Sequence, residues 1–293
     1  MKKRPEDRFQ SAEATLQFLE ANLSGNRDSR TRPQPPALVS GNLFEREGEL
    51  IYLEECFCTA SALASESPCV VVRGPAGIGK TRLVRELSGL VQVSGGAFIE
   101  LSCRHESPGL QPAAEAILSS LETSGVGGLE PLRKVLSHEE AGERSEGELS
   151  ILLESAVLKH AKDMPLLILF DDFQGASETV RRFALNLAQS AKGRLKAGVS
   201  KPKLLVVIAS RKDDAHEDQC LDAFPSIRLK PFSGDASRAF LKHVFAQDDI
   251  PEEILNTLAA CAHGNPGQIL ELAGDLVKEE SIWHSGSKWM FPV

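Results

Sequence analysis

Short apolar runs, most of them rich in β-branched residues, alternate along the middle of the chain with longer stretches of helical periodicity. The runs have the length of strands and are bounded by glycine, proline or polar residues. They predict β-strands at 69–73, 97–103, 166–170, 204–210 and 227–229. Because these runs are apolar throughout and do not alternate with polar residues, we expect a parallel sheet with helices on both faces, which is an α/β fold.

Helical patterns fill the intervals between the strands and the region after them. They predict helices at 47–64, 81–90 and 178–191, and a long helical stretch that ends near residue 162. Beyond residue 233 the pattern is purely helical. Pro251 opens one helix there, Gly264 closes it, and Asn265-Pro266 opens the next. We therefore expect a small helical lid after the sheet.

The same patterns divide the chain into five segments. Residues 43–232 form the predicted core, and residues 233–280 form the lid. Residues 281–293 are apolar and are assigned to the start of a following domain. Residues 23–42 are rich in proline, serine and arginine, which is typical of a linker, and residues 1–22 predict one short amphipathic helix.

Composition and charge narrow the class of protein. The formal net charge of −8 provides no basic surplus for holding nucleic acid, so nucleic-acid binding is not expected. No apolar run approaches the roughly 20 residues that a bilayer helix needs, and no apolar segment follows the charged start, as a secretion signal would require. We therefore expect a cytoplasmic protein without membrane contact. The 6 cysteines are scattered, which favours reduced thiols over a structural metal site.

One glycine-rich motif lies where the first predicted strand ends and a helix begins. It matches the pattern G-x-x-x-x-G-K-[ST], whose four fixed positions arise by chance in roughly one chain in a hundred of this length. Backbone amides of such a loop converge with the helix N-terminus on one point and favour an anion there. The motif therefore predicts binding of ATP or ADP. The predicted nucleotide-binding residues of the loop are Gly74, Pro75, Ala76, Gly77, Ile78, Gly79, Lys80 and Thr81.

Two carboxylates follow the third predicted strand and complete a site for a magnesium nucleotide. Lys80 would reach the β- and γ-phosphates, and Thr81 would ligate Mg²⁺. Asp171 is the predicted second Mg²⁺ ligand, usually through water. Asp172 would point toward the γ-phosphate and orient the attacking water, although a helix N-cap or a turn carboxylate is an alternative interpretation.

Arginines supply the cations that are expected around the phosphates. Arg211 ends the fourth predicted strand, where it would contact the γ-phosphate; an ordinary surface arginine is the competing interpretation. Together with Lys80 and Asp172 it forms the predicted catalytic set. Arg181 and Arg182 lie on the helix after the acidic pair, and we favour a solvated helix face over a contact with a neighbouring subunit.

With these residues placed, residues 40–280 resemble the nucleotide-binding module of the STAND signal-transduction ATPases, a branch of the AAA-related P-loop group. The loop at 74–81 matches the phosphate loop of that group in full. The resemblance implies a P-loop NTPase, in which a parallel β-sheet sandwiched by helices is followed by a small helical lid. It also implies bound ATP or ADP with Mg²⁺ and slow hydrolysis.

Three further stretches carry the resemblance. Residues 43–50 are similar to the family's F-x-G-R-E-x-E-L box near the adenine, which implies a role for Arg46, and a glutamate replaces the glycine of that box. Residues 171–177 resemble D-D-hydrophobic-x-W-A-D, with glycine and serine in place of the tryptophan and the final aspartate. Residues 263–266 resemble the G-x-P lid motif, which implies that Pro266 packs near the base.

A second resemblance covers only the beginning of the chain. Residues 3–12, Lys-Arg-Pro-Glu-Asp-Arg-Phe-Gln-Ser-Ala, look like the closing helix of bacterial serine/threonine protein kinase domains. This resemblance implies that residues 1–22 are the remnant of a kinase fused to the ATPase module. The chain has no glycine-rich kinase loop and no H-R-D or D-F-G triplet, so we expect no kinase activity from it alone.

The sequence therefore predicts a weak ATPase that serves as a nucleotide-dependent signalling switch. Its expected partners are ATP and either other proteins or adjoining sensor and effector domains, and a nucleotide-dependent oligomer is left open. One alternative is an oligomeric AAA ATPase of the origin-recognition type that acts on DNA. The other is a scaffold that does not hydrolyse nucleotide.

Overall fold

The computed structural model describes residues 43–63, 67–103, 109–124, 127–136, 146–197, 202–211, 220–279, 281–285 and 288–291. The helix predicted at 1–22, with its kinase-like sequence, and the linker predicted at 23–42 lie outside these residues. Helices in the described part of the chain are too short or too polar to cross a membrane.

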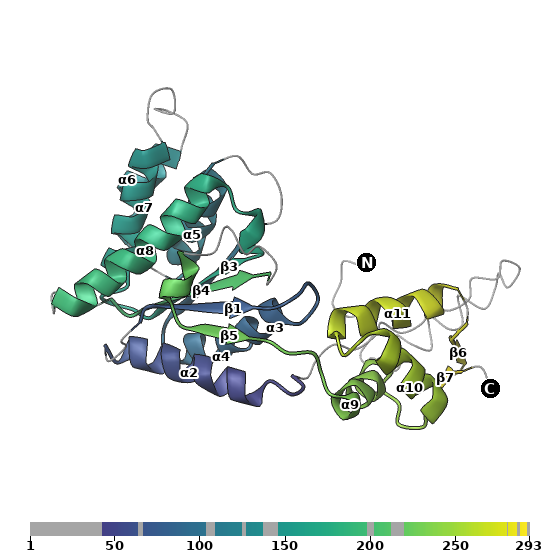
Figure 1. The fold of residues 1–293 in the computed structure, drawn as a ribbon. Helices are drawn as coiled ribbons and strands as arrows, with labels where there is room; N and C mark the ends of the chain where they lie inside the picture. The colour runs from purple at the N-terminus through teal and green to yellow at the C-terminus, as the bar shows by residue number, and fades with distance from the viewer. Residues whose placement is uncertain are drawn as a thin grey trace, which may run out of the picture.

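The core is built on a five-stranded sheet in which every neighbouring pair of strands is parallel (Figure 1). In spatial order the strands are β2 (Ala97–Ser102), β3 (Leu166–Asp171), β4 (Leu204–Ser210), β1 (Cys69–Arg73) and β5 (Ser226–Arg228). The structure thus confirms the predicted parallel α/β fold. Because β4 lies between β1 and β3, the carboxyl ends of these three strands meet at one edge of the sheet.

Helices cover both faces of the sheet, because successive strand side chains point to opposite faces and both sets are apolar. Val71 and Ile168 belong to one hydrophobic cluster, and Val72 and Leu169 belong to the other. The helices over the first face are α5 (Gln111–Thr123), α6 (Glu130–Leu136), α7 (Glu146–His160) and α8 (Glu178–Ala197). Those over the second are α2 (Glu47–Ser61), α3 (Lys80–Arg85) and α4 (Leu87–Val93).

The helices differ from the prediction in how they are subdivided. The helix predicted at 81–90 is two helices that meet at Glu86, which keeps helical backbone angles (φ −60°, ψ −28°). The long helical stretch before residue 162 contains α5, α6 and α7 in the described residues. Gly128, with a φ of +79°, lies between α5 and α6, and this left-handed conformation ends a helical path.

The helical lid follows β5 and has a hydrophobic cluster of its own. It consists of α9 (Gly234–Val244), α10 (Glu252–Cys261), α11 (Pro266–Lys278) and a hairpin of β6 (Trp283–Ser285) with β7 (Lys288–Met290). In Figure 1 the three helices gather beyond the carboxyl end of β1. Ile282 and Trp289 are buried in the lid cluster, although the sequence assigns 281–293 to a following domain. The domain boundaries themselves stay predictions.

Candidate nucleotide-binding site

The glycine-rich loop connects the end of β1 to the start of α3, as predicted. Gly77 has a φ of +75° and Gly79 a φ of +101°, backbone conformations that other residues adopt only under strain. Gly79 is also the residue that precedes the first turn of α3. The amide of Gly74 donates to the carbonyl of Ser210 at 3.3 Å, so the loop begins beside the end of β4.

Lys80 lies at the centre of this loop. Its side chain is buried, and Nζ donates to the carbonyls of Gly74 at 2.9 Å and Pro75 at 3.0 Å. Both acceptors are neutral, whereas a phosphate oxygen carries negative charge and attracts the ammonium more strongly. The ammonium group is therefore in place for a phosphate, which is the predicted role of Lys80.

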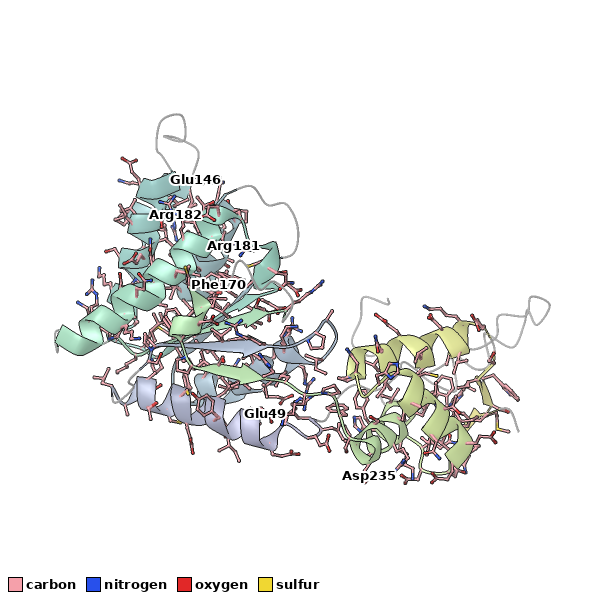
Figure 2. All side chains as sticks on the ribbon, in the orientation of Figure 1. Glu49, Glu146, Phe170, Arg181, Arg182 and Asp235 are labelled. Carbon is pink, nitrogen blue, oxygen red and sulfur yellow. The ribbon has the colours of Figure 1, made fainter. Side chains whose placement is uncertain are left out.

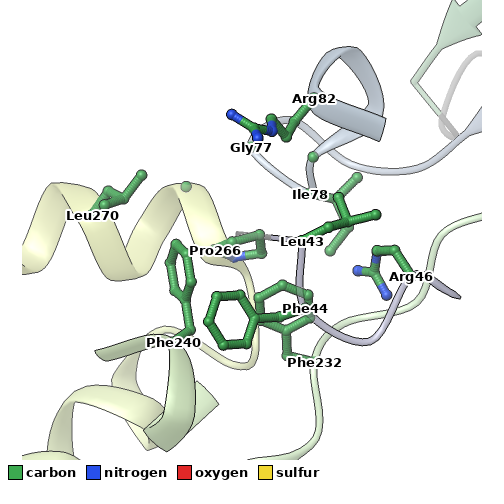
Figure 3. Close-up of a pocket in the computed structure, with 12 residues that line it drawn as sticks. Leu43, Phe44, Arg46, Gly77, Ile78, Arg82, Phe232, Phe240, Pro266 and Leu270 are labelled. Atoms are coloured by element: carbon green, nitrogen blue, oxygen red, sulfur yellow. The ribbon is translucent and has the colours of Figure 1, made fainter. Parts of the chain in front are cut away.

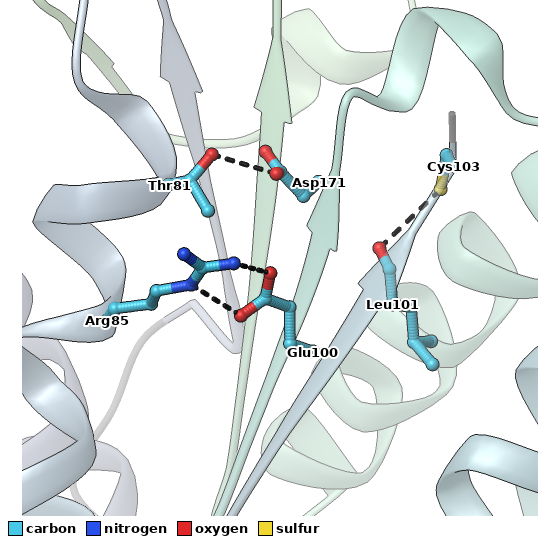
Figure 4. A network of polar contacts seen from close by, with 6 residues as sticks. All are labelled: Thr81, Arg85, Glu100, Leu101, Cys103 and Asp171. Carbon is cyan, nitrogen blue, oxygen red and sulfur yellow. Dashed lines mark hydrogen bonds and ion pairs between the residues drawn. The ribbon is translucent and has the colours of Figure 1, made fainter. Parts of the chain in front are cut away.

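Thr81 and Asp171 form the polar pair that the sequence assigned to Mg²⁺ (Figure 4). Thr81 Oγ1 donates to Asp171 Oδ2 at 2.8 Å, which brings the start of α3 against the end of β3. The other carboxylate oxygen, Asp171 Oδ1, is buried and has no hydrogen-bond partner among the described residues. A buried carboxylate oxygen without a partner is costly unless a cation or water binds it.

The donor set at this pair fits magnesium. Hydroxyl and carboxylate oxygens are the ligands that Mg²⁺ prefers, and it commonly uses one or two carboxylates together with phosphate oxygens. The described residues contain no cluster of three or more His, Cys, Asp or Glu side chains, so a metal site made of protein ligands alone is not present among them. Thr81 and Asp171 would therefore hold Mg²⁺ together with the nucleotide.

Asp172 has an unusual conformation for a residue other than glycine. Its backbone is left-handed (φ 50°, ψ 44°), and it precedes a single helical turn at Phe173–Gly175. Although it occupies the N-cap position of that turn, its side chain makes no capping hydrogen bond. The buried carboxylate instead accepts a hydrogen bond from Gln174 Nε2 at 3.1 Å. The N-cap interpretation therefore does not explain the carboxylate.

Gln174 is a functional candidate that the sequence analysis missed. Its Nε2 donates to Asp172, and its Oε1 accepts the backbone amide of Arg211 at 3.2 Å. One carboxamide thus joins the acidic pair after β3 to the end of β4. The available signal was a polar side chain within the run of residues 171–177, but nothing in the sequence shows that it faces β4.

The three arginines that the sequence singled out differ in their surroundings. Arg211 lies at the end of β4 as expected, with an exposed side chain that makes no hydrogen bond or ion pair with any described residue. Arg181 is not on a solvated face, because it donates to the carbonyls of Ala176 and Gln174 and lies 5.5 Å from the ring centroid of Phe173. These contacts of Arg181 stabilise the turn after Asp172. The predicted solvated position of Arg181 was therefore wrong. Arg182 is exposed, as predicted (Figure 2).

An apolar pocket lies between the phosphate loop and the lid (Figure 3). Its cavity volume is about 130 Å³. The residues that line it are Leu43, Phe44, Arg46, Gly77, Ile78, Gly79, Arg82, Phe232, Phe240, Pro266, Gly267 and Leu270. Three aromatic rings lie at one end, where Arg46 stacks on Phe232, and the loop glycines lie with Arg82 at the other. This arrangement suits a flat base joined to phosphates.

Arg46 lines this pocket but uses its guanidinium on the connection to the lid. Nη2 donates to the carbonyl of Lys230 at 2.6 Å, Nη1 donates to the carbonyl of Glu45 at 2.9 Å, and the cation lies 4.8 Å from the ring centroid of Phe232. Burial lowers the pKa of Arg46 from its ordinary value, and nearby glutamates oppose this shift. Arg46 therefore anchors the segment that leads into α9, and it shapes the pocket.

Glu45 stands where the resembling family has glycine. Its φ of +48° explains the glycine of the box, because that conformation favours residues without a side chain. The carboxylate accepts the backbone amide of Ser233 at 2.8 Å, and its hydrogen bonds with Ser233 hold the pKa of Glu45 below the ordinary value. Ser233 in turn caps α9 by accepting the amide of Ala236. Glu45 thus connects the start of the core to the start of the lid.

The lid motif lies directly on the phosphate loop. Pro266 begins α11 as predicted, and it lines the pocket; its contact with the base stays a prediction. Asn265 Nδ2 donates to the carbonyl of Ala76 at 2.8 Å, and the amide of Gly267 donates to the carbonyl of Gly77 at 2.9 Å. The sequence predicted the helix start at these residues but not their contact with the loop.

Strand β1, the loop, α3 and the carboxylate at the end of β3 together define a P-loop nucleotide-binding fold. The chain belongs to the AAA ATPase domain family, which it matches over residues 42–207, more than half of its length. No curated protein sequence matches it significantly.

Several solved structures are similar to this chain in fold. The Walker-type ATPase PABY2304 of Pyrococcus abyssi is 17% identical with a TM-score of 0.55, over 84% of this chain and 71% of that one. The ORC1 protein of Aeropyrum pernix in complex with DNA is 19% identical with a TM-score of 0.56, over 82% of this chain and 62% of that one. The Aeropyrum pernix ORC2 protein, in ADPNP–ADP complexes, is 15% identical with a TM-score of 0.57, over 83% of this chain and 65% of that one. The chain thus spans less than two thirds of the two Aeropyrum proteins, and these identities support a shared fold alone.

Proposed function

We propose that this chain binds ATP or ADP with Mg²⁺ and that the nucleotide sets the position of the lid relative to the core. The observation that carries this proposal is the pocket that both parts build. Gly77 and Gly79 come from the phosphate loop of the core, and Pro266 and Leu270 come from the lid. A ligand in this pocket touches both parts, so it can favour one arrangement of them over another.

The chemistry of the proposed site follows from the roles of its side chains. Lys80 binds the β- and γ-phosphates, and Thr81 and Asp171 hold Mg²⁺, which neutralises part of the phosphate charge. Asp172 orients the attacking water, and Arg211 contacts the γ-phosphate. One oxygen of Asp172 is engaged by Gln174, and the Arg211 side chain reaches no described residue. We infer slow hydrolysis from the resemblance of residues 43–50 and 263–266 to the STAND ATPases.

Slow hydrolysis and a lid suit a signalling switch of the STAND type better than a motor. The box around Arg46 and the lid motif around Pro266 support this subtype. Other proteins or adjoining sensor and effector domains would then detect the lid position. Fusion to a serine/threonine kinase stays a prediction that rests on residues 3–12 alone.

Isothermal calorimetry on the purified chain tests the proposal. We expect ATP and ADP to bind in the presence of Mg²⁺, and we expect Lys80→Ala to weaken binding of both. Arg85→Ala, which removes an exposed cation from the same helix, is the matched control. Absence of binding by the folded parent would refute nucleotide binding. Equal affinity of the parent and Lys80→Ala would favour a scaffold that does not use the phosphate loop.

An oligomeric ATPase that acts on DNA is the second candidate. The fold shared with ORC1 of Aeropyrum pernix, whose structure contains DNA, favours it. The net charge of −8 argues against it, because affinity for DNA depends on cations that neutralise phosphates. Binding of duplex DNA that weakens steeply between about 50 and 200 mM salt would support this candidate.

A further inference from the structure

Lid helix α11 begins directly on the phosphate loop, through the bonds from Asn265 to Ala76 and from Gly267 to Gly77. We call these two hydrogen bonds the lid latch. We propose that Asn265 is a positioning residue: through the latch it orients the loop amides for a phosphate, and thereby couples lid docking to phosphate binding. The inference rests on the proposed nucleotide binding at the same loop.

Peptide planarity explains how a bond to a loop carbonyl acts on a loop amide. The carbonyl of one residue and the amide of the next form one rigid unit, and in a trans peptide they point in opposite directions. The bond to Ala76 O therefore fixes the direction of the Gly77 N–H, and the bond to Gly77 O fixes that of the Ile78 N–H. Within the described residues the Gly77 amide has no protein acceptor, so it is available for an anion.

The loop needs such external support because of its glycines. Gly77 has access to both left- and right-handed conformations, so its φ of +75° is not fixed by a side chain. Lys80 already engages the carbonyls of Gly74 and Pro75. The latch engages the next two, Ala76 and Gly77. All four consecutive carbonyls are thus held by protein donors, two of which belong to the lid.

The contact is fitted closely and has a single polar side chain at its centre. Asn265 is buried, and its Oδ1 caps α11 by accepting the amides of Gly267 and Gln268, while Nδ2 reaches Ala76. The backbones of Gly77 and Gly267 meet so closely that a Cβ on Gly267 would lie 2.6 Å from Gly77 Cα. The first seven residues of α11, Pro-Gly-Gln-Ile-Leu-Glu-Leu, contain no lysine or arginine. This helix start therefore meets the loop through the latch and not through a cation.

Coupling between two events is reciprocal. If the docked lid improves phosphate binding by some factor, a bound phosphate improves lid docking by the same factor. The latch acts on loop amides, so it affects ligands with phosphates. Adenosine, which would use only the apolar end of the pocket, should bind independently of it.

Two substitutions break the latch without weakening the helix. Asn265→Asp keeps the cap acceptor and places a negative charge at the helix N-terminus, where it is favourable, but it cannot donate to Ala76. Gly267→Ala raises helix propensity, but its Cβ collides with Gly77. One matched control is Asn256→Asp, at an exposed position of α10. The other is Gly274→Ala on α11, where a Cβ meets nothing within 4 Å.

We expect each latch variant to bind ADP roughly tenfold more weakly than the parent, because a loop carbonyl loses the lid donor that holds it. Adenosine affinity and both controls should stay within about twofold of the parent values. Limited proteolysis without nucleotide provides a second readout, in which cleavage within the lid at 233–280 is faster in Asn265→Asp than in Asn256→Asp.

Three results would overturn the inference: ADP affinity that does not change, an equal loss for adenosine and ADP, or cleavage of the lid that does not change. Failure of the proposed function looks different. In that case the parent binds neither adenine nucleotide, while proteolysis without nucleotide still shows whether Asn265 fastens the lid.

Discussion

Gln174 joins two residues that lie on neighbouring strands and are far apart in the sequence. It donates to the carboxylate of Asp172 and accepts the amide of Arg211, while Arg181 holds its backbone carbonyl from α8. Its side chain is therefore fixed at both ends. A residue fixed in this way controls where the Asp172 carboxylate points.

Replacing this bridge should affect hydrolysis more than binding. We expect Gln174→Met, which keeps the length of the side chain but neither polar contact, to lower the rate of ATP hydrolysis roughly tenfold. ATP affinity should change by less than about threefold, because the phosphate loop is untouched. Single-turnover hydrolysis and calorimetry measure the two quantities. The exposed Gln92 provides the control Gln92→Met, and parallel losses of rate and affinity would contradict this role.

Cys103 shows how the acidic pair affects its surroundings. Burial, followed by the charges of Asp171 and Asp172, raises the pKa of its thiol to about 12. Because a pKa above the ordinary value leaves the thiol protonated, the reactive thiolate is scarce at pH 8. We expect iodoacetamide to modify the exposed Cys58 much faster than Cys103, as measured by peptide mass spectrometry. Equal rates would show that the thiol is not held protonated.

At the scale of elements, the contacts that position α3 differ greatly in their contribution to stability. Arg85 on α3 forms a two-bond ion pair with Glu100 on β2, but the arginine side chain is 57% exposed (Figure 4). Water and salt screen such a pair, so it contributes little to the free energy of unfolding. The apolar faces of α3 and α8 are buried against the sheet, and this burial contributes far more to the free energy of unfolding.

Urea denaturation of two variants measures this difference. We expect Arg85→Ala to lower the free energy of unfolding by less than about 1 kcal/mol. Phe183→Ala should lower it by about 3–5 kcal/mol, because the ring of Phe183 on α8 has no exposed surface and leaves a cavity. The ranking is wrong if the surface variant proves the less stable of the two.

At the scale of the whole molecule, three sets of polar contacts join the core to the lid in the described part of the chain. Arg46 and Glu45 hold the segment between β5 and α9, the amide of Phe232 donates to the carbonyl of Gly264 at 2.7 Å, and Asn265 reaches the phosphate loop. All three lie around one pocket. A ligand that fills this pocket therefore links the stability of the two parts.

Nucleotide should stabilise the lid together with the core. ADP at 100 times its dissociation constant should add about 2.7 kcal/mol to the free energy of unfolding, if it binds only the folded state. We expect protease cleavage in both 233–280 and the core to slow by a similar factor. Digestion with and without ADP, followed by mass spectrometry, measures this. A lid whose cleavage does not respond to ADP would contradict the proposed coupling.

The sequence by itself determined the elements and the chemistry of the phosphate loop. Strand-sized apolar runs, the spacing of Gly74 to Thr81, the carboxylates after β3 and the caps of α11 are local patterns, and local backbone preferences act over a few residues. These patterns sufficed for the parallel sheet, the position of Lys80, and the pair of Thr81 with Asp171.

Only the tertiary structure decided which of these pieces touch one another. The bond from Arg46 to Lys230 spans 184 residues, that from Asn265 to Ala76 spans 189, and that from Arg211 to Gln174 spans 37. No local pattern encodes such pairs, because each depends on the order of strands in the sheet and on where the lid packs. The solvated position predicted for Arg181 was wrong for a more local reason. Its acceptors, Ala176 and Gln174, are 5 and 7 residues away and face it only once the turn after Asp172 has folded back.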